Sequence, residues 1–156
     1  MNGKLPLSLN DRQHFLVFGG PYRKKPDHMV GVKMAVEIDR PFDIEVPTVD
    51  FQVPSMTDME EGIDKAVTEI LKGKQLYVGC MGGIGRTGLF LACLAKVFGE
   101  KDPVVYVRKH YLSHAVETVP QQKFVANFNP KPWTLRKIKI AGFFLRISRK
   151  NLLTKV

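Results

Sequence analysis

The chain of 156 residues has the length of one domain, and its 44% hydrophobic and 25% charged residues are typical of a folded globular protein. No apolar run approaches the ~20 residues of a membrane-spanning helix, and the first residues, MNGKLPLSLNDRQ, lack the apolar stretch of a signal peptide. Two cysteines do not make a disulfide framework, so we expect a cytoplasmic protein. Two cysteines and four histidines without paired spacing predict no structural zinc site.

The net charge of +9 is concentrated at one end of the chain. Residues 131–156 hold eight Lys/Arg and no acidic residue, which leaves 16 basic against 15 acidic residues in the first 130. The body of the chain is therefore nearly neutral, and any argument from charge about a partner concerns the tail alone.

Three short strands are predicted in the first third of the chain. The stretch HFLVFGG (14–20) is a short apolar run that ends at two glycines. Apolar and polar side chains alternate in VKMAVEI (32–38) and again in FDIEV (42–46), which is the period of a β-strand.

A helix is predicted next, in TDMEEGIDKAVTEILKGK. Its apolar residues from Met59 to Leu71 recur on one helical face. Thr57 and Glu60 have the spacing of a capping box, and Gly73 is a suitable stop.

The following segments predict a buried strand and a buried helix. KQLYVG (74–79) is a short apolar run suited to the centre of a sheet. Residues 86–98 are almost wholly apolar, as in a helix that is covered on all sides, and we expect Cys93 within it to be a small core residue.

Two further helices are predicted from their starts. Asp102 followed by Pro103 is typical of a helix N-terminus, and Thr118 with Gln121 repeats the capping-box spacing. Strands mixed with helices in this order predict an α/β domain with a mostly parallel central sheet flanked by helices.

The tail leaves two structures open. KIKI and LRIS alternate like strands, whereas Ile140, Phe144 and Ile147 share one helical face. We expect residues 1–130 to form the domain and residues 131–156 to be a basic C-terminal extension that packs on it with its cations in water. The alternative is a basic amphipathic element that binds an anionic membrane or nucleic acid. The sequence does not predict the oligomeric state.

The stretch YVGCMGGIGRTGLF (77–90) leads from the buried strand into the buried helix, the place where ligands bind in such folds. Its glycines allow successive N–H groups to face one point, and with the helix N-terminus they predict an anion site. Arg86 adds a planar set of donors that matches phosphate oxygens. Cys80 stands in this positive field, which favours the nucleophilic thiolate.

CMGGIGRTG resembles the C-x5-R-[ST] signature of cysteine-dependent protein tyrosine and dual-specificity phosphatases. VPTVDFQVPSMTDMEEGIDKAV is similar to the family's general-acid loop, with Asp50 followed by Pro54 and Ser55. AVETVPQQKFV is similar to the segment in which a glutamine, here Gln121, positions the hydrolytic water. The resemblance covers about residues 15–128, and the short chain favours the compact dual-specificity type.

The resemblance implies a role for each matching residue. Cys80 would be the nucleophile and Asp50 the general acid, while Thr87 would stabilise the departing thiolate and Gln121 would orient water. The phosphate would be bound by Arg86 and by the backbone of the loop, which comprises Met81, Gly82, Gly83, Ile84, Gly85 and Arg86. No metal or other cofactor is required. Without the resemblance, Asp50 beside Pro and Ser would be assigned to a turn.

One position departs from the family, because Gly79 stands where a histidine usually precedes the cysteine. The expected substrate is a phosphorylated protein, with phosphotyrosine and then phosphoserine or phosphothreonine. The basic tail keeps a polynucleotide 5′-phosphatase open, and Gly79 keeps open a module that binds phosphate without hydrolysing the ester. A lipid phosphatase is less expected, since the loop has no lysine.

Overall fold

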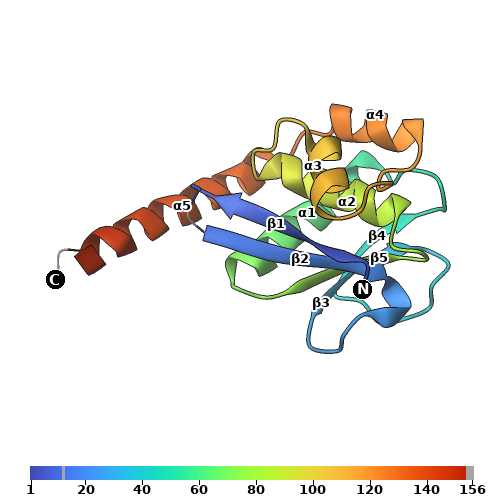
Figure 1. Ribbon diagram of the computed structural model, residues 1–156, viewed down its shortest axis with the longest axis horizontal. Coiled ribbons are helices and arrows are strands. Elements are labelled where there is room, and N and C mark those ends of the chain that lie inside the picture. The colour runs from blue at the N-terminus through green and yellow to red at the C-terminus, as the bar shows by residue number, and fades with distance from the viewer. Residues whose placement is uncertain (12, 154–156) are drawn as a thin grey trace.

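A five-stranded sheet forms the centre of the protein in a computed structural model that describes residues 1–11 and 13–153 (Figure 1). The strands lie in the order β1-β2-β5-β3-β4. Their bounds are β1 (Gly3–Leu9), β2 (Gln13–Pro21), β3 (Val30–Ala35), β4 (Ile44–Thr48) and β5 (Leu76–Cys80). A short 3-10 helix η1 (Tyr22–Lys24) follows β2. The α-helices are α1 (Met56–Leu71), α2 (Gly85–Val97), α3 (Pro103–His110), α4 (Val119–Asn127) and α5 (Pro132–Leu153).

The sheet is mostly parallel, as predicted. β2, β5, β3 and β4 run in the same direction, and β1 joins the edge of β2 as an antiparallel hairpin partner. Every residue of β5 is buried, since this strand lies between β2 and β3 and is covered by helices. The predicted α/β class is confirmed, and the carboxyl end of the central strand is at Cys80.

Several predicted element boundaries differ from the structure by two or more residues; the strand predicted over 42–46, for example, is β4, Ile44–Thr48. The strand predicted over 32–38 ends at Ala35, so that Glu37 leaves the sheet. The first helix is capped by Ser55, whose Oγ accepts a hydrogen bond from the Asp58 N–H at 3.0 Å, rather than by the predicted Thr57.

The capping box of Thr118 and Gln121 at the start of α4 is present as predicted. Asp102 precedes α3 with Pro103 in its first turn, but its side chain makes no capping hydrogen bond. The tail is the helix α5, so the strand alternative for KIKI and LRIS is wrong.

α5 contacts the domain through its first half. The Thr134 hydroxyl donates to Oδ1 of Asp64 on α1 at 2.6 Å, and the Lys137 ammonium donates to both oxygens of the same carboxylate at 2.9 Å. Gly142 lies against the side chain of Asn10 in the turn between β1 and β2. Beyond that point α5 extends away from the sheet (Figure 1). Within residues 1–11 and 13–153, no helix combines the length and apolar character needed to cross a bilayer.

Candidate active site

The candidate site lies in the loop between the central strand β5 and the helix α2. Cys80 is the last residue of β5 and only 3% exposed. Its Sγ accepts a hydrogen bond from the Thr87 hydroxyl at 3.2 Å, so the first turn of α2 holds the sulfur. The strand-to-helix connection predicted from the sequence therefore brings these two side chains together.

The backbone donors of the loop are unused. In the part of the chain that the structure describes, no N–H group from Met81 to Thr87 has a hydrogen-bond acceptor. Gly83 allows this conformation, because its φ is +74° and a Cβ there would collide with the backbone of Gly20. A row of free N–H groups at a helix N-terminus is suited to bind an anion.

Arg86 is held in place by its terminal nitrogens, while its Nε–H makes no hydrogen bond in the described residues. Its Nη1 donates to the Glu37 carboxylate and to the Thr48 carbonyl oxygen, both at 2.9 Å, and its Nη2 donates to the other Glu37 oxygen at 2.6 Å. Its Nε is buried and has no partner among the described residues. Because a buried donor without a partner costs free energy, this group is suited to a ligand oxygen.

The Glu37–Arg86 pair shifts the titration of both groups. The hydrogen bond from Arg86, together with the Arg86 and Lys33 charges, lowers the pKa of Glu37 from 4.5 to about 2 against the opposing effect of burial. Burial acts to lower the pKa of Arg86, but the Glu37 hydrogen bond and the negative charges of Cys80, Glu37 and Asp50 outweigh it and raise that pKa. The guanidinium therefore stays charged.

Asp50 lies at the mouth of the site. Its side chain is 56% exposed, and its Oδ1 is 3.3 Å from Nη2 of Arg86 and accepts the Phe51 N–H at 3.0 Å. Phe51 has a φ of +59°, a conformation that few residues other than glycine adopt. This strained turn places the predicted acid beside the predicted phosphate ligand.

Gln121 is brought to the same place by α4. It is fully buried, its Nε2 donates to the Gln52 carbonyl oxygen at 3.3 Å, and its Oε1 lies against Gly85 of the loop. The Thr118 hydroxyl donates to the Phe51 carbonyl oxygen at 3.4 Å. The start of α4 is thus tied to the turn that carries Asp50.

The structure leaves no room for a side chain at Gly79. A Cβ at this position would lie 2.7 Å from the Cα of Tyr22 and 2.9 Å from the Gly20 carbonyl oxygen, so no side chain fits. Two other side chains hold the loop from outside. The buried Tyr111 hydroxyl donates to the Gly83 carbonyl oxygen at 2.6 Å, and the Asn2 amide donates to that of Gly82 at 2.8 Å.

All the predicted site residues therefore lie together. Four further residues that contribute to the site were not predicted from the sequence. Glu37 and Thr48 orient Arg86, while Asn2 and Tyr111 hold the loop. From the sequence alone, Glu37 was only a polar position in a predicted strand. The four residues lie 28 to 80 positions along the chain from the groups that they bind. The sequence predicted Gln121 in a capping box, but its spacing did not predict that the same side chain packs against the loop.

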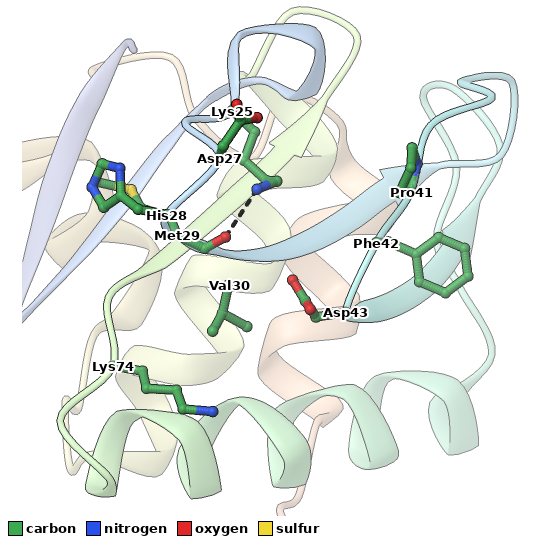
Figure 2. A pocket seen from close by; sticks show the side chains of 9 residues that line it. All are labelled: Lys25, Asp27, His28, Met29, Val30, Pro41, Phe42, Asp43 and Lys74. Carbon is green, nitrogen blue, oxygen red and sulfur yellow. Dashed lines mark hydrogen bonds between the residues drawn. The ribbon is translucent and has the colours of Figure 1, made fainter.

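A hollow of about 450 Å³ lies outside this site (Figure 2). It is lined by Lys25, Asp27, His28, Met29, Val30, Pro41, Phe42, Asp43 and Lys74, with no residue of the loop. Its Lys25 ammonium donates to the Pro26 and Met29 carbonyl oxygens, and its Asp43 carboxylate accepts the Gly31 N–H. Lys25 and Asp43, two of the charged groups of the hollow, are thus engaged within the protein. No cluster of three or more His, Cys, Asp or Glu side chains suited to a metal ion occurs in the described residues.

The sequence has relatives that share this part of the chain. Residues 31–129 match the model of the family described as "PTP-SAK: Swiss Army Knife protein, DSP-PTPase phosphatase domain". An uncharacterised protein of Methanocaldococcus jannaschii is 41% identical over 83 residues, which are 53% of this chain and 52% of that protein. A candidate tyrosine phosphatase of Invertebrate iridescent virus 6 is 36% identical over 54% of this chain and 32% of its own length. The match with the archaeal relative thus spans about half of that protein.

Solved structures share the fold. The structure of Tk-PTP in its active form has a TM-score of 0.58 and 22% identity, covering 65% of this chain and 78% of that chain. Kinase associated phosphatase, with serine in place of its catalytic cysteine, has a TM-score of 0.60 and 16% identity, covering 80% of this chain and 92% of that chain. At these identities the likeness concerns the fold alone.

Proposed function

Because this chain belongs to the DSP-PTPase phosphatase family, we propose that it hydrolyses phosphate monoesters through a cysteinyl-phosphate intermediate. The observation that supports this most directly is the set of unused donors around the Cys80 sulfur. The free N–H groups from Met81 to Thr87 and the unpaired Nε of Arg86 are donors that the three terminal oxygens of a phosphoryl group, which share its negative charge, would occupy.

In the first step, the Cys80 thiolate attacks phosphorus. The sulfur lone pair forms the S–P bond, the bond from phosphorus to the leaving oxygen breaks, and the Asp50 carboxyl proton passes to that oxygen. The loop N–H groups and Arg86 stabilise the charge that develops on the other phosphoryl oxygens. The pair with Glu37 orients the guanidinium before substrate arrives.

In the second step, water breaks the intermediate. The Asp50 carboxylate takes a proton from a water molecule, the water oxygen bonds to phosphorus, and the S–P bond breaks to return the thiolate. The Thr87 hydroxyl stabilises that thiolate, because it already donates to Sγ. Gln121 lies against Gly85 and is placed to orient the water. All these groups come from the protein chain.

The proposed substrate is a phosphorylated protein, with phosphotyrosine first and phosphoserine or phosphothreonine next. The viral relative with a tyrosine phosphatase description supports this choice. We place the enzyme in the cytoplasm, because Cys80 must stay a free thiol to act, and both cysteines are free in the structure. The basic α5 does not favour a polynucleotide substrate, because it packs near the β1–β2 turn, at the opposite end of the sheet from Cys80.

The test is hydrolysis of an aryl phosphate in the presence of a metal chelator, followed by a panel of phosphopeptides, 5′-triphosphorylated RNA and phosphoinositides. We expect the wild-type protein to be active and Cys80→Ser to be inactive. Cys93→Ser is the matched control, because this second thiol is fully buried in α2 and should be dispensable for turnover. Wild-type rates in Cys80→Ser would refute the nucleophile. Phosphopeptide binding without turnover would identify a binding module instead.

A further inference from the structure

The outer face of α5 carries large apolar side chains that are exposed in the described part of the chain. Trp133, Ile140, Phe143 and Phe144 are 56%, 48%, 60% and 63% exposed. Their spacing along the helix places them on one face. A cluster of exposed aromatic side chains of this kind marks an interaction surface.

The inner face of the same helix is already occupied. Thr134, Ile138 and Gly142 recur every four residues and are buried against the domain. The ion pair of Lys137 with Asp64 and the hydroxyl of Thr134 fix this orientation. The exposed aromatic face is therefore an outcome of how α5 packs, since rotating the helix to bury it would break these bonds.

Cations border the outer apolar face. Arg136 and Lys139 are exposed between the aromatic side chains, and the Arg136 guanidinium lies 5.9 Å from the centre of the Trp133 ring. Residues 131–156 contain no acidic residue to neutralise them, whereas the first 130 residues are nearly neutral. Aromatic and aliphatic side chains bordered by Lys and Arg are the composition of helices that lie in a membrane interface.

We propose that the outer face of α5 binds the surface of a bilayer that contains anionic phospholipids. Trp133, Ile140, Phe143 and Phe144 would enter the headgroup region, and Arg136 and Lys139 would pair with lipid phosphates. An anionic bilayer matches both the apolar side chains and the cations of this face. A nucleic acid would match the cations but leave the aliphatic and phenyl side chains in water, and a second copy would oppose two surfaces of the same charge.

The position of α5 in the fold determines how the phosphate site would face when α5 binds a membrane. β2 runs from the β1–β2 turn, which Gly142 of α5 contacts, to Pro21, which pairs with Cys80. A strand of nine residues spans roughly 25 Å, so α5 and the loop are at opposite ends of the sheet (Figure 1). Docking through α5 would hold the protein at the surface while its phosphate site faces away from the lipid, open to a protein substrate.

The test is co-sedimentation of the full chain with phosphatidylcholine vesicles, with and without phosphatidylserine, at low and high salt. We expect binding only to the anionic vesicles, weakened by salt. Ile140→Ser with Phe144→Ser, and separately Arg136→Gln with Lys139→Gln, should each lower the partition coefficient at least about tenfold. Val105→Ser with Lys109→Gln is the matched control, because both side chains are exposed on α3, outside the proposed face, and binding should be unchanged.

Far-UV circular dichroism and thermal unfolding of each variant check the fold without reference to catalysis, so the result does not depend on the proposed enzyme activity. Three outcomes would overturn the proposal. The first is that the wild-type protein binds no vesicles, and the second is that the α3 variant loses as much binding as the α5 variants. The third is that the protein forms a dimer through α5 that vesicles do not dissociate. Tighter binding of an RNA oligonucleotide than of anionic vesicles, lost in the same variants, would assign the face to nucleic acid instead.

Discussion

Arg86 depends on Glu37, because the carboxylate accepts hydrogen bonds from both terminal nitrogens of the guanidinium. A glutamine at position 37 has one acceptor oxygen and no charge, so the guanidinium would be less well oriented. We expect Glu37→Gln to lower kcat/KM by about ten- to a hundredfold, since small displacements of a positioning group have effects of this size. Steady-state kinetics on an aryl phosphate measures this. Glu45→Gln is the control, because Glu45 pairs with Lys33 at 2.9 Å and makes no contact with Arg86.

The same substitution has a consequence for stability at low pH. The pKa of Glu37 is about 2 in the folded protein, below its ordinary 4.5, so the carboxylate stabilises the fold above 4.5 and this contribution is lost as the pH falls toward 2. The free energy of unfolding of Glu37→Gln should therefore depend less on pH in this interval than that of the wild type. An identical pH dependence would show that the pair does not form.

A comparison of Tyr111 with Tyr106 separates the effect of the Tyr111–Gly83 contact on catalysis from its effect on stability. Each hydroxyl donates to a backbone carbonyl oxygen at 2.6 Å, that of Gly83 in the loop for Tyr111 and that of Pro6 for Tyr106. Substitution of either by phenylalanine leaves a carbonyl without its partner, which costs about 1–3 kcal/mol where the group is buried.

We expect both variants to lose stability in urea unfolding, but only Tyr111→Phe to lose kcat/KM, because Gly83 belongs to the phosphate loop. Equal kinetic losses in the two variants, or none in either, would remove Tyr111 from the positioning of the loop. Gly79 leaves no room for a side chain, so the loop is held by contacts from outside it, from Tyr111 and Asn2.

The start of α4 connects two parts of the site. Thr118 caps the helix and donates to the Phe51 carbonyl oxygen in the turn that carries Asp50. We expect Thr118→Val to cost about 1 kcal/mol of stability through the lost cap and to lower kcat as well, because the acid is less well placed. Thr134→Val, which loses a hydroxyl bond to Asp64 away from the loop, should affect stability without affecting kcat. Activity profiles of both variants against pH make the comparison.

Elements with a strong periodic pattern could be predicted from the sequence, and those defined by distant contacts could not. The apolar run of β5 and the capping box of α4 were read correctly, since both are local signals. β1 was not predicted, although Leu5, Leu7 and Leu9 alternate inward around Pro6, a residue that disfavours a central strand. The antiparallel edge position of β1 tolerates that proline. The helical tail remained ambiguous because its two apolar faces obscure a single period.

The residues of the site also fall into those predictable from local spacing and those brought in by distant contacts. Cys80, Arg86 and Thr87 lie within one loop and its helix, so their spacing alone predicted their proximity. Glu37 meets Arg86 only because β3 lies beside β5 in the sheet, and that neighbour relation is a property of the topology rather than of either segment. A single sequence has no signal for such a contact.

Among the contacts between the domain and α5 in the described residues is the partly buried ion pair of Lys137 with Asp64. Burial alone would raise the pKa of Asp64, but hydrogen bonds from Thr134 and Lys137 and the charges of Lys137 and Lys131 outweigh it and lower that pKa. Because the folded-state pKa is depressed, the carboxylate contributes stability above its unfolded pKa, and the contribution is lost as the pH falls.

We therefore expect Asp64→Asn to be less stable than the wild type near neutral pH, with the difference shrinking in acid. Urea unfolding at several pH values measures this. Asp102→Asn is the control, because the Asp102 carboxylate is exposed and caps nothing. A difference that does not change with pH would mean that the charge of Asp64 does not hold α5 on α1.

The central claim is that the phosphoryl group passes through the Cys80 sulfur. The most direct measurement is rapid acid quenching of the enzyme during turnover of a phosphotyrosyl peptide, followed by mass spectrometry of the peptide that contains Cys80. We expect one added phosphoryl group on Cys80 and none on Cys93, with more of it in Gln121→Ala, because the hydrolytic water is then poorly oriented. Sustained turnover without any phosphoryl group on Cys80 in either protein would contradict the mechanism.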